Sequence, residues 1–170
     1  VDDDNFGVDA GIDGRTEASA WGTLQKAHDE ASAGDTIIVL PGVYSEGVSE
    51  DKQGHKNRLM VSKKLYFKAK EGSASTHIVG QIDPDTKKFG PKGVRGILVA
   101  DGGLGSEFHG FTIRDCGSGD GGDHAAGYTT GMGGGALVYG NYTDYSAPYP
   151  THIEIADSSV FVTFFDVGDG

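Results

Sequence analysis

Most apolar residues of this chain fall into short runs that end at Gly, Asp, Asn, Ser or Pro. The first run, residues 36–40, is rich in β-branched residues and ends at Pro41 and Gly42. Runs of this kind are typical of β-strands closed by turns. Further runs lie at residues 43–44, 59–61, 65–67, 77–79, 96–99, 108–113, 136–139, 152–155 and 160–165. The pattern therefore predicts strands along most of the chain.

One segment has a different period. Between residues 21 and 31 the apolar positions recur at helical spacing, with polar residues opposite them. The stripe consists of Trp21, Leu24, Ala27, His28 and Ala31. Gly34 supplies a stop signal. We expect a short helix within residues 21–33, preceded by an acidic loop at residues 1–20.

The absence of helical patterns between the expected strands argues against a doubly wound sheet. A sandwich or barrel would favour two-residue hairpins, and Asp101-Gly102 is the best candidate for such a turn. Gly-rich loops of uneven length are commoner here. The pattern therefore favours an all-β solenoid, in which each coil adds one strand to each face. We expect residues 34–170 to form coils of one domain.

Two segments carry a resemblance to a known superfamily. Residues 21–27 (WGTLQKA) and 33–44 (AGDTIIVLPGVY) resemble the opening of pectate-lyase-like β-helix proteins. Later segments are similar to large bacterial secreted β-helix repeat proteins: 57–59, 78–80, 93–96, 110–113 and 133–136. The resemblance implies a right-handed parallel β-helix, a short N-terminal capping α-helix and an extracellular or cell-surface location. It does not imply one function, because the superfamily holds enzymes, adhesins and fibres.

Composition and charge limit the classes of molecule that this chain is expected to bind. Glycine accounts for 29 residues, as expected for many tight turns, and the formal net charge is −11. A surface this acidic repels phosphate backbones and anionic lipid. We therefore expect no nucleic-acid partner and no membrane insertion. The single cysteine, Cys116, excludes an internal disulfide, and we expect it to be a small core residue.

A Gly-rich segment at residues 117–135 is a candidate metal site. Asp115, Asp120 and Asp123, with His124 beside them, could converge on Ca²⁺, which prefers carboxylate oxygens. The alternative, which we favour, is a corner loop with solvated acids. The acids within residues 9–14 pose the same choice, and there we favour turns stabilised by Asp side chains.

Four tyrosines in a polar stretch are candidate ligand contacts: Tyr139, Tyr142, Tyr145 and Tyr149. Tyrosine among small polar residues is typical of adaptable binding loops, and its ring can cover a sugar face. A loop held against the protein by its tyrosines is an equal alternative.

Catalytic residues are harder to identify. A polysaccharide lyase needs a base and a cationic clamp for the uronate carboxylate, and Arg95 and Arg114 lie on or beside expected strands. Asp115 follows Arg114, but neighbours in a strand point to opposite faces, so the two side chains need not meet. We favour a solvated position for Arg114.

These observations leave three functional hypotheses. The first is a non-catalytic extracellular module that serves as a stalk, an adhesion surface or a polysaccharide contact. The second is the N-terminal part of a polysaccharide lyase or a related carbohydrate-active enzyme, and the third is a self-assembling fibre subunit. Residues 160–165 are apolar in both alternating phases, so we expect further coils beyond residue 170 or end-to-end self-association.

Overall fold

The computed structural model describes residues 1–8, 11–52, 54–85, 90–117 and 135–138, and two later strands at 154–156 and 159–160. Its helices are α1 (Leu24–Glu30) and three short 3₁₀ turns, η1 (Asp3–Asn5), η2 (Glu17–Ser19) and η3 (Asp101–Gly103). The strands are β1 (Thr36–Val39), β2 (Gly42–Tyr44), β3 (Ser49–Glu50), β4 (Lys56–Val61), β5 (Tyr66–Ala69), β6 (Thr76–Val79), β7 (Val94–Val99), β8 (Glu107–His109), β9 (Thr112–Arg114), β10 (Ala136–Val138), β11 (Glu154–Ala156) and β12 (Ser159–Val160).

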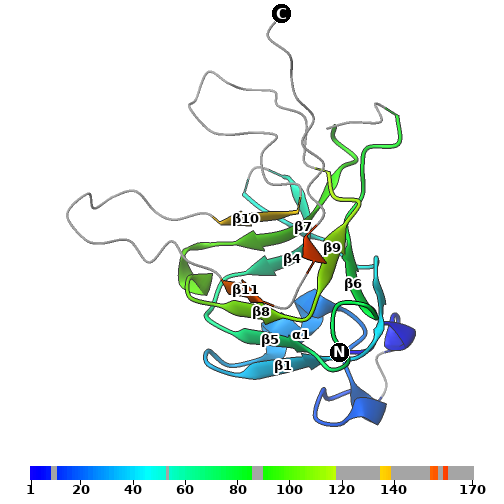
Figure 1. Ribbon diagram of the computed structural model, residues 1–170, viewed down its shortest axis with the longest axis vertical. Helices are drawn as coiled ribbons and strands as arrows, with labels where there is room; N and C mark the ends of the chain where they lie inside the picture. The colour runs from blue at the N-terminus through cyan, green and yellow to red at the C-terminus, as the bar shows by residue number, and fades with distance from the viewer. Residues whose placement is uncertain are drawn as a thin grey trace, which may run out of the picture.

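The strands form three separate four-stranded sheets, ordered β1-β5-β8-β11, β10-β7-β4-β3 and β12-β9-β6-β2. Apart from β3 and β4, successive strands of the chain enter different sheets. The neighbours within a sheet are parallel except for this one antiparallel pair, β3 and β4. Figure 1 shows β1, β5 and β8 lying one above another, with β6 and β9 at the side. The corner between β8 and β9 contains Gly110 at φ 78°, a backbone conformation that favours glycine.

One core joins the sheets. In the first sheet, Ile37 is in register with Phe67, and Phe67 with Phe108. The two phenylalanine rings are parallel, with centroids 4.7 Å apart. Inward residues of the other sheets belong to the same cluster, among them Leu59, Ile97, Ile78 and Ile113. Because side chains alternate between the two sides of a strand, every second residue of a strand points into this core.

Helix α1 closes the edge of β4. Thr23 caps its N-terminus by accepting a hydrogen bond from the Lys26 amide (3.1 Å), while Leu24 and Ala27 are buried against the core. The helix is shorter than the expected span of residues 21–33, and Trp21 lies before it, partly buried. Its polar side chains also bind backbone: the Met60 amide donates to Gln25 Oε1 (2.7 Å) and the Ser62 amide donates to His28 Nε2 (3.1 Å).

The prediction of an all-β solenoid, a right-handed parallel β-helix, is wrong for the architecture found. The strands form three small open sheets rather than one closed or solenoid sheet, an α-helix packs beside them, and one sheet mixes parallel with antiparallel pairing. The physical reason is local: residues 49–57 fold back as a short antiparallel pair, and helical side chains occupy the rest of that edge. The architecture is therefore one of three small sheets, one of them mixed, with a helix beside them.

Within the described ranges, no helix has the length and apolar character needed to cross a membrane. Residues 161–165, on which the expectation of further coils or end-to-end contacts depended, lie outside the described part, so that expectation stays a prediction.

Leu24 offers a direct test of the helix packing, because its side chain is only 2% exposed. Leu24→Asp should lower the free energy of unfolding by about 3–5 kcal/mol, since it removes a buried leucine and buries a charge. For a chain of this length that corresponds to a melting temperature roughly 10 °C lower. The control Ala33→Asp adds the same charge at an exposed position and should melt within a few degrees of the parent; equal melting of both variants would refute the packing.

Candidate functional site

The outward side chains of β1, β5 and β8 form a mostly polar surface, which we call the outer face. It consists of Thr36, Ile38, Tyr66, Lys68, Glu107 and His109. Each of these residues is exposed or half-buried, and they alternate with the buried residues Ile37, Phe67 and Phe108. The alternation that builds the core therefore also builds this face.

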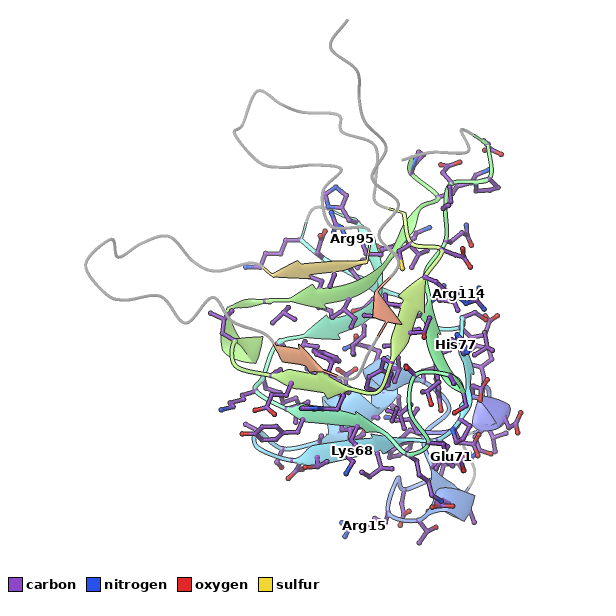
Figure 2. The ribbon with its side chains drawn as sticks, in the orientation of Figure 1. Arg15, Lys68, Glu71, His77, Arg95 and Arg114 are labelled. Atoms are coloured by element: carbon purple, nitrogen blue, oxygen red, sulfur yellow. The ribbon has the colours of Figure 1, made fainter. Side chains whose placement is uncertain are left out.

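Register brings the chemically active members of the outer face together. Tyr66 is paired with Glu107 and Lys68 with His109 on adjacent parallel strands, which lie about 4.8 Å apart. The His109 Nε2 atom lies 3.1 Å from Glu107 Oε2, and these side chains are 35% and 36% exposed. Figure 2 shows Lys68 on the same sheet.

The chemistry of this surface follows from those contacts. The Tyr66 ring is half-buried, with the Lys64 ammonium 5.5 Å from its centroid, so the ring is held in place while part of it stays accessible. Glu107 orients the His109 imidazole through this contact. The outer face thus presents an aromatic ring, a cation and an oriented histidine on rigid strands.

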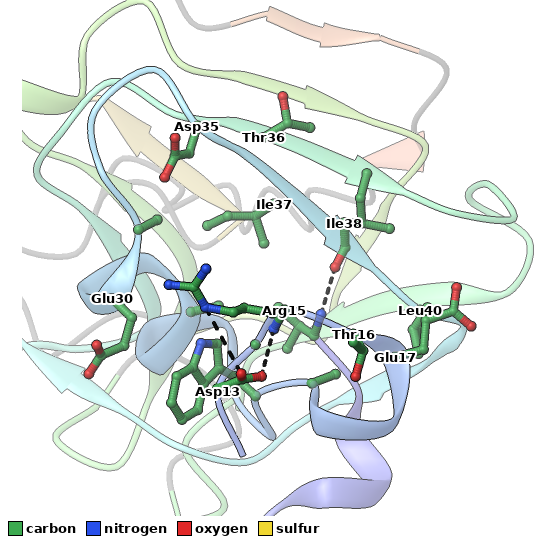
Figure 3. Close-up of a pocket in the computed structure, with 16 residues that line it drawn as sticks. Asp13, Arg15, Thr16, Glu17, Glu30, Asp35, Thr36, Ile37, Ile38 and Leu40 are labelled. Atoms are coloured by element: carbon green, nitrogen blue, oxygen red, sulfur yellow. Dashed lines mark hydrogen bonds and ion pairs between the residues drawn. The ribbon is translucent and has the colours of Figure 1, made fainter. Parts of the chain in front are cut away.

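A groove of about 660 Å³ lies beside β1, on the side away from β5. Its lining includes Arg15, Trp21, Glu30, Asp35 and residues of β1. In Figure 3 the Arg15 side chain extends over Asp13 toward β1.

The carboxylates of the groove are engaged within the protein. Asp13 accepts hydrogen bonds from Ser19 Oγ (2.6 Å) and the Arg15 amide (3.0 Å), which lower the pKa of its carboxyl. Glu30 pairs with Lys26, and Glu17 pairs with Lys70. Because these carboxylates are already bonded within the protein, the groove is better suited to contacts than to acid catalysis.

No family model, no curated protein and no solved structure matches this chain. The similarity to pectate-lyase-like proteins therefore receives no support from known proteins, and the assignment of function depends on the geometry alone.

The two arginines considered for lyase chemistry have different surroundings. Arg95 is 2% exposed, and its guanidinium donates to Asp51 (3.1 Å) inside the protein, so it is not accessible to a polymer. Asp51 also accepts a bond from the His55 amide (2.9 Å), so Arg95 and Asp51 connect β7 to the loop before β4.

Arg114 and Asp115 meet, although the alternation of strand side chains did not require it. Asp115 follows the last residue of β9 and has φ 53°, so the alternation of strand side chains no longer applies to it. Its carboxylate accepts a hydrogen bond from the Arg114 guanidinium, which therefore is not simply solvated.

The expected calcium site is only partly within the described residues. Asp115 is described, whereas Asp120, Asp123 and His124 are not. Among the described positions no group of three His, Cys, Asp or Glu residues could hold a metal ion. The calcium hypothesis stays a prediction, and Asp115 would have to leave Arg114 to serve it.

The four candidate tyrosines, Tyr139, Tyr142, Tyr145 and Tyr149, also lie outside the described residues, so their role is not tested. Apolar runs predict which residues of a strand form the core, but not that the outward residues of three strands form one face. Its signal was available: a polar residue stands on each side of Phe67 and of Phe108. The sequence pattern does not indicate which strands lie next to one another in a sheet.

Cys116 provides a test of the interior beside β9. Burial raises the pKa of its thiol to about 11, and the thiol donates to the Arg114 carbonyl (3.1 Å). Because the thiolate is the reactive form, the folded protein should react with iodoacetamide at pH 8 at least about tenfold more slowly than a free cysteine. The urea-unfolded chain is the control and should react at the ordinary rate; equally fast reaction of the folded protein would show that the thiol is not buried.

Proposed function

We propose that this chain is an extracellular, non-catalytic contact module of a secreted or surface protein, and that it binds a polysaccharide through the outer face. The observation that carries the proposal is the placing of Tyr66 beside Lys68, Glu107 and His109 on adjacent parallel strands. The net charge of −11 is unfavourable for nucleic acid and anionic lipid, which makes a glycan the better partner.

The chemical fit is with a sugar ring. An aromatic ring provides an apolar surface with little loss of conformational entropy, and flanking polar groups can donate to and accept from sugar hydroxyls. Groups fixed on strands keep their geometry better than groups on loops. The pairing of β8 with β11 continues the sheet, so equivalent positions recur from strand to strand, as a linear polymer requires.

A second candidate function, uronate β-elimination, is favoured by one specific observation. The His109–Glu107 pair lies next to Lys68, so an oriented base and a cation share the same surface. In such a reaction the imidazole would take the C5 proton of the uronate while Lys68 neutralises the carboxylate charge. The electrons of the broken C–H bond would form the C4–C5 double bond, the C4–O glycosidic bond would break, and the imidazolium would return its proton to the departing oxygen.

The contact proposal is tested with Tyr66 variants on arrays of neutral and acidic polysaccharides. Tyr66→Ala should weaken glycan binding about tenfold, or about 1.4 kcal/mol, whereas Tyr66→Phe keeps the ring and most of the affinity. Val43→Ala is the matched control, because Val43 is exposed on a different sheet and its loss should leave binding unchanged. Binding that survives Tyr66→Ala, or no binding to any glycan, would refute the proposal.

The lyase alternative is tested by incubating the protein with pectin, alginate and other uronates. Ultraviolet absorbance of unsaturated product, lost in both His109→Ala and Lys68→Gln, would establish catalysis at the outer face. Absence of product alongside retained glycan binding would leave the contact function and remove the enzyme. Product formation that is unaffected by both variants would place catalysis elsewhere.

A further inference from the structure

The outward positions in and next to β5 concentrate positive charge on an acidic protein. The outward side chains are, in chain order, Lys64, Tyr66, Lys68 and Lys70. The side chains between them are buried in the core, so the row is fixed by the alternation of the strand. The chain as a whole has a formal net charge of −11, which makes this row a local exception.

Two lysines of the row have no acidic partner. Lys70 forms an ion pair with Glu17. Lys64 and Lys68 form no ion pair with any residue that the structure describes. The carboxylate of the outer face, on Glu107, is in contact with His109 instead. Two cations next to the Tyr66 ring are therefore left without a counter-charge from the described chain.

The position of Lys64 relates it directly to Tyr66. Its side chain passes beside Gly105, where an added Cβ atom would be 3.5 Å from Lys64 Cε. The ammonium lies over the Tyr66 ring, 5.5 Å from the centroid. A cation in this place is attracted by the negative face of the ring. Lys64 thus covers part of the aromatic surface that the proposed function assigns to a sugar.

This arrangement makes the charge of the sugar important. A neutral sugar that stacks on the covered part of the ring has to displace the ammonium and offers no charge in return. A sugar with an anionic group can pair with the displaced Lys64. Lys68, two residues further along the strand from Tyr66 and about 7 Å away, can pair with such a group on the other side of the ring.

The size of the patch favours a single glycan chain among anionic ligands. Tyr66 and its two neighbouring lysines extend over only about 13 Å along the strand. A nucleic-acid duplex or a membrane surface would also approach the acidic remainder of the protein, which repels it. A single polysaccharide chain can contact the lysines without meeting that remainder.

We propose that Lys64 determines the specificity of the outer face, and that this face selects sugars bearing an anionic group, either a carboxylate or a sulfate ester, over neutral sugars. Lys64 disfavours neutral sugars by occupying the Tyr66 ring and favours anionic ones by pairing with them. The inference rests on the proposed function, because it requires that Tyr66 contacts the sugar.

The test uses two matched pairs of polymers and titration calorimetry. The first pair is polygalacturonate and its fully methyl-esterified, neutral form; the second is dextran sulfate and dextran. We expect the protein to bind the anionic member of at least one pair about tenfold more tightly than the neutral member. A preference within the first pair identifies a carboxylate and one within the second a sulfate ester. The preference should shrink when the salt rises from about 0.05 M to about 1 M, because salt screens exposed charges.

Lysine variants separate the role of Lys64 from a general effect of charge. Lys64→Gln should weaken binding of the anionic polymer about fivefold and strengthen binding of its neutral partner about two- to fivefold, because the ring is no longer covered. Lys68→Gln should weaken anionic binding without any gain for the neutral polymer. Lys52→Gln is the matched control: it removes the same charge from an exposed position between β3 and β4, in another sheet, and should change neither affinity.

Three results would overturn the inference: equal binding of both members in both pairs, no gain in neutral binding for Lys64→Gln, or a loss of anionic binding for Lys52→Gln as large as that for Lys64→Gln. Binding without preference that Tyr66→Ala abolishes would leave the contact function in place and remove only the role of Lys64. Failure of all four polymers to bind, together with no binding on the glycan arrays, would overturn both.

Discussion

The in-register stack of Ile37, Phe67 and Phe108 is the interaction on which the rest of the structure depends, because it fixes the alignment of β1, β5 and β8. A shift of one residue in any of these strands would move its apolar side chains to the solvent and its polar ones into the core. The same register therefore determines that Tyr66 lies beside Glu107 and that Lys68 lies beside His109. Core and outer face are two consequences of one alignment.

A parallel sheet leaves unpaired backbone groups at its first strand, and the N-terminal segment of the chain satisfies most of them. Asp3 bonds the β2 edge, Gln25 and His28 bond the β4 edge, and Val1 bonds part of the β1 edge. These bonds prevent the sheet edges from pairing with strands of other molecules. The short helix α1 therefore stabilises the structure in two ways. Its polar side chains bind backbone groups at the β4 edge, and Leu24 packs into the core.

The polar groups of the chain divide into those that serve the fold and those that remain available. Arg95 and Asp51 are bonded to each other in the interior, and Arg114 is bonded to Asp115. Tyr66, Lys68 and His109 keep part of their surface exposed on strands that the core holds rigid. A surface of that kind favours recognition of an extended ligand, and the histidine held by Glu107 is the feature from which acid–base chemistry at this surface could arise.

The sequence by itself determined the strands, because short β-branched runs bounded by turn residues have few alternatives, and it determined a helix around Leu24 and Ala27 from their spacing. It did not determine how the strands pair. The expected solenoid was wrong because local pattern carries no information on the fold-back at residues 49–57 or on sheet boundaries. Only the tertiary structure decided that Lys68 and His109 share a surface and that Arg95 is buried, because both facts depend on contacts between residues about forty positions apart in sequence. Asp115 shows the same limit at short range: its left-handed backbone, set by the end of β9, brings it to Arg114 where strand alternation would have kept them apart.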